Sequence, residues 1–315
     1  MRVLIVGGAG YVGGYLTDYL KTWKCGYEVT VYDVLAYEDR FLKEVSFIRG
    51  DVRDRDKLLG LLPYFDVVIW LAAVVGDGAC AADPFLARAI NEDATRWLVD
   101  HYDGKIIFPS TCSVYGVNND LIDETADPHP LSIYAVTKLA AEQYILEHRP
   151  DSLVFRLGTL YGLGDEHSRI RLDLVVNILA KKAALGEKLT VNGGNQWRPL
   201  LHVRDVANAI QFGLRHDISG LFNLASENRQ IYEIADAIQR AVPSCRIEKV
   251  DMNTEDQRNY QVSCKKWEAT GWKPAWTIEM GIHQIVNVVR GGRIKDPNDP
   301  VYSNEYYLKG YPKPF

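Results

Sequence analysis

The stretch Val3-Leu4-Ile5-Val6-Gly7-Gly8-Ala9-Gly10-Tyr11-Val12-Gly13 decides the fold. Its first four residues are apolar and predict a buried β-strand, and the apolar spacing that begins at Val12 predicts a helix directly after the glycines. Glycines at such a turn let the backbone approach a diphosphate, whose charge is stabilised at the helix N-terminus. The stretch therefore predicts a dinucleotide site. Its expected contacts are Gly7, Gly10, Tyr11, Val12 and Gly13.

A dinucleotide site commonly has an acidic residue at the end of its second strand, and this chain has one there. Asp33 lies at the end of the second expected strand, 20 residues after Gly13. A carboxylate there accepts hydrogen bonds from an adenosine ribose and repels a 2′-phosphate, which favours NAD over NADP. Arg40 lies close enough in sequence to leave NADP as an alternative. Asp51 and Val52, just after the third expected strand, are candidates for the adenine edge.

The first half of the chain alternates short β-branched runs with segments of helical periodicity, which predicts βαβ units. The expected strands are Val3 to Val6, Glu28 to Tyr32, Val45 to Ile48, Asp66 to Leu71, Lys105 to Phe108 and Leu153 to Phe155. The expected helices between them are Val12 to Trp23, Pro84 to His101 and Ile133 to His148. We therefore expect an α/β fold with a doubly wound parallel Rossmann sheet of six or seven strands.

After Phe155 the pattern changes to glycine-rich loops and helices, which predicts a smaller C-terminal substrate-binding lobe. The helices are expected at Leu172 to Leu185, Val203 to Arg215, Ile231 to Ala241 and Ile278 to Val289. The apolar run Leu221 to Leu224 is expected to rejoin the first sheet. The cofactor domain is then 1–158 with a returning segment near 200–224, and the lobe comprises 159–199 and 225–295. Residues 296–315 hold four Pro and four Tyr without periodicity and are expected to form a tail or a surface strap.

Composition excludes several classes of function. The 315 residues are 47% hydrophobic and 24% charged, as in globular proteins, and a net charge of −5 leaves no electrostatic footprint for nucleic acid. The longest apolar run, Val67 to Val75, is shorter than a membrane helix, and the N-terminus does not resemble a signal peptide. Five widely spaced cysteines without a C-x-x-C pair, and scattered histidines, suggest neither disulfides nor a metal site. We expect a cytoplasmic protein.

A tyrosine and a lysine are placed for proton transfer. Tyr134 and Lys138 stand four residues apart on a helix expected to begin near Ser132, so they share one face. A free Tyr titrates near 10 and acts as a base at neutral pH only beside a positive charge, which Lys138 can supply. Hydroxyl residues Ser110 and Thr111 follow a strand, at the sheet edge where ligands bind. Taken alone, the Tyr and Lys would more often be a surface pair.

Together these motifs resemble the extended short-chain dehydrogenases/reductases that act on nucleotide-diphosphate sugars, the NAD-dependent epimerase/dehydratase family. The resemblance rests on Gly7 to Gly13, Asp33, Asp51-Val52, Leu71-Ala72-Ala73, Ser110 to Gly116, Tyr134 with Lys138, Trp197 to Val206 and Ala269 to Pro274, and it spans about the first 290 residues. It implies a catalytic triad of Thr111, Tyr134 and Lys138. It also implies cofactor contacts from Leu71, Ala72, Ala73, Ser110 and Leu157. We further expect a homodimer.

The resemblance implies a reaction at C4 of the sugar, in which Tyr134 takes a hydroxyl proton while a hydride moves to the nicotinamide. Dehydratases of the family carry an Asp-Glu pair directly after the catalytic Thr, and this chain has Cys112-Ser113. A 4-epimerase is therefore the expected activity and a 4,6-dehydratase is disfavoured. A net 4-dehydrogenase or 4-keto reductase for a hexose or heptose uses the same residues and stays open. A cofactor-binding scaffold without catalysis is disfavoured by the complete triad.

The substrate side departs from the family pattern at Thr159, where the family usually has Asn. The stretch Arg169 to Asn177 is similar to a branch that includes nucleotide-heptose 4-dehydrogenases. Arg198 is expected to pair with the substrate diphosphate, because a guanidinium matches phosphate oxygens bidentately. For Arg258 a diphosphate role and a solvated surface position are equally supported. The expected substrate contacts are Thr111, Cys112, Ser113, Thr159, Arg171, Asn177, Arg198 and Arg258.

Overall fold

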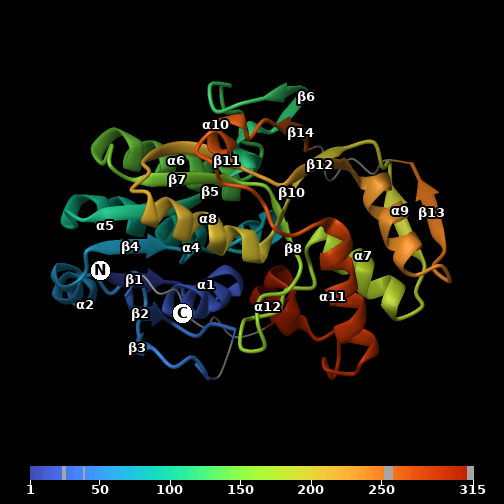
Figure 1. Ribbon diagram of the computed structural model, residues 1–315, viewed down its shortest axis with the longest axis horizontal. Coiled ribbons are helices and arrows are strands. Elements are labelled where there is room, and N and C mark those ends of the chain that lie inside the picture. Colours follow the sequence, from blue (N-terminus) through green and yellow to red (C-terminus); the bar gives the residue numbers. More distant parts are fainter. Residues whose placement is uncertain (23–25, 38–39, 252–257, 311–315) are drawn as a thin grey trace.

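A parallel sheet of seven strands forms the centre of the computed structural model, which describes residues 1–22, 26–37, 40–251 and 258–310 (Figure 1). The strand order is β11-β7-β5-β4-β1-β2-β3, and every neighbouring pair is parallel. The strands are β1 (Arg2–Val6), β2 (Glu28–Asp33), β3 (Ser46–Arg49), β4 (Val67–Trp70), β5 (Lys105–Thr111), β7 (Leu153–Leu157) and β11 (Gly220–Leu224). The doubly wound fold is confirmed, and Leu221 to Leu224 does rejoin the sheet beside β7.

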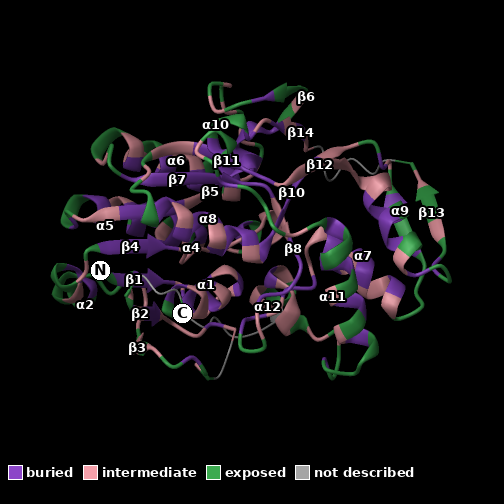
Figure 2. Ribbon diagram, in the orientation of Figure 1, coloured by how far each residue is buried: buried purple, intermediate pink, exposed green. Residues whose placement is uncertain are grey.

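Both faces of this sheet are covered, which explains why its strands are apolar throughout rather than alternating. Val68 and Trp70 of β4 belong to one buried cluster, while Val67 and Ile69 belong to a second cluster on the opposite face. Figure 2 shows the central strands buried between these layers. The covering helices are α1 (Tyr11–Thr22), α2 (Arg55–Leu61), α4 (Pro84–Arg88), α5 (Ala94–His101), α6 (Ile133–His148) and α8 (Val203–Arg215), with the turn η1 (Leu62–Tyr64).

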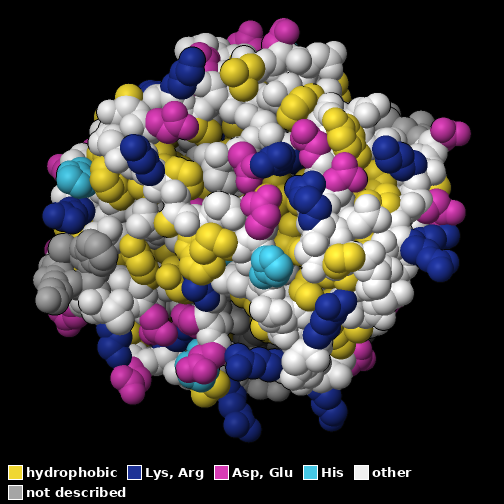
Figure 3. All heavy atoms as spheres, turned by 45° about the vertical axis from the view of Figure 1, so that its right-hand side comes forward, with side chains coloured by type: hydrophobic (Ala, Val, Ile, Leu, Met, Phe, Trp, Pro, Cys, Tyr) yellow, Lys and Arg dark blue, Asp and Glu magenta, His cyan; other side chains and the backbone are white. Residues whose placement is uncertain are grey.

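The second part of the chain adds a smaller unit with its own buried cluster, packed between three helices. Its elements are β8 (Thr159–Tyr161), α7 (Val175–Ala184), β9 (Leu189–Asn192), β10 (Trp197–His202), β12 (Glu227–Gln230), α9 (Ile231–Ala241), β13 (Ile247–Val250) and α11 (Ile278–Arg290). The remaining elements are η3 (Cys112–Tyr115), β6 (Val117–Ile122), β14 (Asn259–Val262) and α10 (Lys265–Glu268). On the face in Figure 3, basic and acidic side chains are interspersed.

The single helix expected over Pro84 to His101 is interrupted by the π-helical turn η2 (Ala89–Asp93). Asn91 in this turn is buried, accepts a hydrogen bond from the Val74 N–H at 2.8 Å and donates to the Val74 carbonyl at 2.9 Å. Such bulges are frequent at functional sites. Here the turn fixes the loop that follows β4, and Ile90 within the turn lines the cavity described below.

The tail also differs from expectation, because part of it is regular. It contains η4 (Pro300–Tyr302) and α12 (Asn304–Gly310), and α12 packs against α3 (Asp77–Ala82). Residues 311–315 lie outside the described part of the chain. Seven residues are too few for helical periodicity to show in the sequence. In the described residues, no helix combines the length and hydrophobicity that crossing a membrane requires.

Candidate active site

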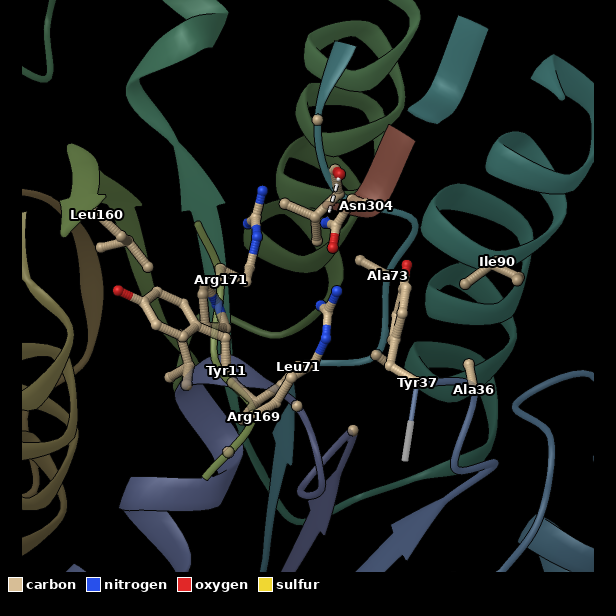
Figure 4. A pocket seen from close by; sticks show the side chains of 18 of the residues that line it. Tyr11, Ala36, Tyr37, Leu71, Ala73, Ile90, Leu160, Arg169, Arg171 and Asn304 are labelled. Carbon is tan, nitrogen blue, oxygen red and sulfur yellow. Dashed lines mark hydrogen bonds between the residues drawn. The ribbon is translucent and has the colours of Figure 1, made fainter. Parts of the chain in front are cut away.

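A cavity of about 300 Å³ lies at the carboxyl ends of the parallel strands, beside the point between β1 and β4 where the strand order reverses (Figure 4). Ligands of open α/β sheets bind at such a point. Most residues predicted from the sequence line it. These are Gly7, Gly10, Tyr11, Val12, Gly13, Asp33, Asp51, Val52, Leu71, Ala72, Ala73, Ser110, Thr111, Ser113, Tyr134, Lys138, Leu157, Thr159, Arg171 and Arg258.

The glycine loop is packed too closely for side chains. Gly7 has φ +87°, and a Cβ there would lie 2.5 Å from the backbone nitrogen of Ala72. A Cβ on Gly13 would lie 2.5 Å from the Gly7 carbonyl oxygen. The loop thus brings the first turn of α1, whose leading N–H groups have no intrahelical acceptors, to the cavity. These residues fit the diphosphate of a dinucleotide.

Ser110 gives a second indication that the cavity is built for a polar ligand. It stands near the carboxyl end of β5 and is 2% exposed, and its hydroxyl has no hydrogen-bond partner among the described residues. A buried hydroxyl without a partner is costly, and a ligand's polar group relieves that cost. The cavity therefore fits the NAD predicted from the sequence.

The Asp33 side chain, at the end of β2, is hydrogen-bonded to the glycine loop. Its carboxylate accepts hydrogen bonds from the backbone N–H groups of Ala9 at 2.9 Å and Leu35 at 2.7 Å. Burial raises the pKa of Asp33, while these backbone hydrogen bonds and the charge of Arg169 oppose that rise. Arg40 does not line this cavity.

We therefore expect NAD to bind more tightly than NADP, because Asp33 would face a 2′-phosphate with like charge. Isothermal titration with both cofactors measures the preference, and Asp33→Asn should narrow it. Equal affinity of the wild type for both, or tighter NADP binding, would show that a basic side chain overrides the carboxylate.

The three residues of the predicted triad line the same cavity. Ser132 caps α6 by accepting a hydrogen bond from the Ala135 N–H at 3.2 Å, which places Tyr134 in the first turn and Lys138 one turn later. The Lys138 ammonium lies 3.7 Å from the centroid of the Phe108 ring. Thr111 ends β5 and accepts a hydrogen bond from the Ser113 N–H at 3.1 Å.

Burial dominates the electrostatics of this triad. It raises the pKa of Tyr134 above its ordinary value, and the lowering effects of the Arg171 charge and a hydrogen bond with Thr111 do not cancel it. Burial also lowers the pKa of Lys138 to about 7. We expected Lys138 to lower the Tyr134 pKa. The influences that oppose the rise come from Arg171 and Thr111, and burial of Lys138 disfavours its own charged form.

The burial of Lys138 predicts that its contribution to folding stability depends on pH. The pKa of Lys138 is about 7 in the folded protein and near 10.4 when unfolded, so between these values the unfolded state binds more protons. The contribution of Lys138 to stability therefore rises with pH over that window. The stability advantage of Lys138→Met over wild type should shrink from about pH 7 to about pH 9, measured by denaturant unfolding. A constant difference would contradict an enclosed Lys138.

Three predicted substrate residues do not line the cavity. The Cys112 thiol is fully buried and donates to the Arg156 carbonyl at 3.2 Å. The Asn177 amide is buried and binds backbone groups instead of facing the cavity. Arg198 is 5% exposed and donates to the carbonyls of Trp197 and Arg258, so the diphosphate role assigned to it from the sequence is not supported. Its position on β10, inside a three-stranded sheet, turns its guanidinium toward backbone acceptors.

Sequence reasoning also missed polar residues that line the cavity, among them Tyr37, Asp77, Arg169 and Asn304. Asp77 forms an ion pair with Arg258 at 2.9 Å and accepts a hydrogen bond from the Ser132 hydroxyl at 2.6 Å. Arg169 could have been found, because it stands two residues before Arg171 in the stretch already singled out from the sequence. For Asn304 the sequence carries no signal.

Comparisons with known proteins agree with this geometry. The model of the NAD dependent epimerase/dehydratase family matches residues 3–225. The chain belongs to this family. It is an NAD-dependent enzyme, and its resemblance to the extended short-chain dehydrogenases/reductases is confirmed.

Individual relatives of this epimerase/dehydratase share nearly their whole length with it. The low-salt glycan biosynthesis protein Agl12 of Haloferax volcanii is 29% identical, covering 92% of this chain and 99% of its own. A putative UDP-glucose 4-epimerase of Methanocaldococcus jannaschii is 28% identical, covering 90% and 97%. The structure of a Thermus thermophilus UDP-glucose 4-epimerase with NAD matches with a TM-score of 0.78 and 28% identity, covering 92% and 99%.

Proposed function

We propose that this enzyme is a nucleotide-diphosphate-sugar 4-epimerase, which oxidises the C4 hydroxyl of the sugar and then reduces the ketone from the opposite face. The observation that carries the proposal is the meeting of Thr111, Tyr134 and Lys138 in the same cavity as the glycine loop. The relatives named UDP-glucose 4-epimerases support the substrate class.

The bound nicotinamide supplies the acceptor and donor of the hydride. Tyr134 takes the proton from the C4 hydroxyl and returns it when the ketone is reduced. Burial raises the pKa of Tyr134, and the positive charge of Arg171 opposes that rise. Thr111 also orients the reacting oxygen, and Lys138 sits one helical turn behind Tyr134 to bind a ribose hydroxyl.

The cavity supports epimerisation better than dehydration. Elimination of water needs an acid beside the reacting carbons. Directly after Thr111 the cavity offers only the Ser113 hydroxyl, because the Cys112 thiol points into the core. Among the described lining residues the carboxylates are Asp33 and Asp51 at the adenosine end and Asp77, which is paired with Arg258.

A net 4-dehydrogenase or 4-keto reductase is the second candidate. Thr159 lines the cavity, and its side chain is shorter than the Asn that the family usually has. A hydroxyl in place of that amide changes the hydrogen bonds offered to the sugar and suits weaker retention of the ketone.

A panel of UDP-, dTDP-, GDP- and CDP-sugars, analysed by mass spectrometry and NMR, tests the proposal. An epimerase converts one sugar into its C4 epimer without net accumulation of reduced nicotinamide. Release of a ketone with stoichiometric reduced nicotinamide would instead establish the dehydrogenase. Absence of both with every sugar would leave only cofactor binding.

The diphosphate of the substrate is expected to meet Arg258 rather than Arg198. Arg258→Ala should weaken binding of the nucleoside diphosphate by about 1.5 to 3 kcal/mol, the scale of a hydrogen bond to a charged group, while NAD affinity is kept. Arg198→Ala is the comparison, and it should lower the unfolding temperature with little change in nucleotide affinity. The reverse pattern in titrations with UDP would return the role to Arg198.

We further propose a cytoplasmic homodimer. Support comes from large apolar side chains exposed on neighbouring helices, namely Phe85 on α4 and Ile133 and Val136 on α6. Such side chains suit an interface between two copies. Sedimentation of the wild type and of Phe85→Glu measures the state, and a monomeric wild type would contradict the proposal.

A further inference from the structure

Arg171 is fixed at the cavity by the C-terminal segment. Its guanidinium donates two hydrogen bonds, both 3.0 Å long, to the two carboxylate oxygens of Asp173. Asp173 in turn accepts a hydrogen bond from the Asn304 N–H at 2.9 Å, and the Asn304 side-chain amide donates to the Val75 carbonyl at 2.8 Å. One residue of the tail thus connects the arginine to the loop after β4.

A second set of contacts places Arg171 beside the start of α1. The Asn177 amide donates to the Arg171 carbonyl at 2.8 Å and reaches the Tyr11 hydroxyl at 3.5 Å. Tyr11 is the first residue of α1, and its hydroxyl donates to the Gly162 carbonyl at 2.7 Å. Figure 4 shows the side chains of Arg171 and Arg169 reaching into the cavity near Tyr11.

We propose that Arg171 is a cofactor ligand, which binds the diphosphate of NAD together with the N-terminus of α1, and that Asn304 positions it. A diphosphate at a helix N-terminus is stabilised by the helix dipole and by free N–H groups. A guanidinium 8% exposed in the same cavity adds bidentate hydrogen bonds from the other side. Arg171 is then no substrate ligand, contrary to the expectation from the sequence.

The side-chain oxygen of Asn304 is available to contact the cofactor. It is 3% exposed and lines the cavity, and its side-chain oxygen accepts no hydrogen bond within the described part of the chain. Three residues later Tyr307 packs on Tyr37 at 4.9 Å between ring centroids, and the Tyr37 ring lies 3.4 Å from the Arg169 guanidinium. The C-terminal segment therefore touches the cavity wall at two places, and it slows the release of NAD.

The test measures NAD dissociation without any sugar, so it is independent of the sugar reaction proposed above. Asn304→Ala should release NAD about 10-fold faster and Arg171→Met about 10-fold to 100-fold faster, as for lost hydrogen bonds to a charged group. Arg171→Lys should recover part of the loss. UDP affinity should stay unchanged in all three variants. Asn298→Ala, which loses only the Lys181 contact of the same segment, is the matched control and should behave as wild type.

Unfolding of the cofactor-free proteins separates positioning from a structural role. Asn304→Ala removes a buried amide that donates to the Val75 carbonyl, so it is expected to lower the unfolding temperature of the cofactor-free protein. Arg198→Ala, which is destabilised outside the cavity, is therefore the comparison. The proposal requires faster NAD release from Asn304→Ala and wild-type release from Arg198→Ala. It is overturned if Arg171→Met weakens UDP and spares NAD, which makes Arg171 a substrate ligand. It is also overturned if release is unchanged in every variant, or if faster release accompanies loss of cofactor-free stability in Arg198→Ala as well.

Discussion

Tyr134→Phe is expected to lower turnover by a factor of about 10² to 10⁴, the usual contribution of a positioned acid or base. Only the phenolic oxygen is removed, and the ring remains in the first turn of α6, so NAD affinity should be nearly unchanged. Steady-state rates with the sugar identified by the panel give the first quantity, and titration with NAD gives the second.

Tyr144→Phe is the matched control, because Tyr144 lies on the same helix and its hydroxyl donates to Asp100 at 2.7 Å, outside the cavity. It should keep wild-type turnover. Full activity of Tyr134→Phe would remove that residue from the mechanism.

Gly7→Ala is expected to abolish measurable NAD binding and to destabilise the fold. The residue has φ +87°, a conformation costing an L side chain about 1–3 kcal/mol, and its new Cβ would overlap the Ala72 backbone at 2.5 Å. Relief of that overlap moves the loop away from the first turn of α1. NAD titration and denaturant unfolding measure the two effects.

Gly60→Ala controls for the substitution itself. Gly60 lies in α2, and a Cβ there meets no atom within 4 Å. The unfolding midpoint of Gly60→Ala should therefore stay at or above the wild-type value. If Gly7→Ala bound NAD like the wild type, the glycine loop would not be the cofactor site.

The fold was predictable because its signals are local. Buried parallel strands appear as short apolar runs, and α6, α8 and α9 have the bounds expected from their periodicity. Capping residues fix where these helices begin. Ser132 accepts a hydrogen bond from a backbone N–H in the first turn of α6, and Gln230 with Glu233 forms a capping box on α9. The glycine loop and Tyr134 with Lys138 were predictable for the same reason, since each acts through neighbours in sequence.

The missed features depend on contacts between distant parts of the chain. Asn304 reaches Asp173 across 131 residues, and nothing near either residue encodes that contact. Arg198 has the residue type of a phosphate ligand, but its burial against backbone carbonyls becomes visible only in the folded sheet. The raised pKa of Tyr134 likewise follows from its burial in the folded protein, which spacing on one helix does not reveal.

The most direct test of the central claim follows deuterium placed at C4 of the nucleotide sugar that the panel identifies. Transfer of that hydrogen to the cofactor and back predicts a product inverted at C4 that keeps its deuterium there when the reaction runs in ordinary water. Inversion at a neighbouring carbon with uptake of a solvent hydrogen, or loss of the deuterium from C4 to water, would contradict oxidation at C4 and the role assigned to Tyr134.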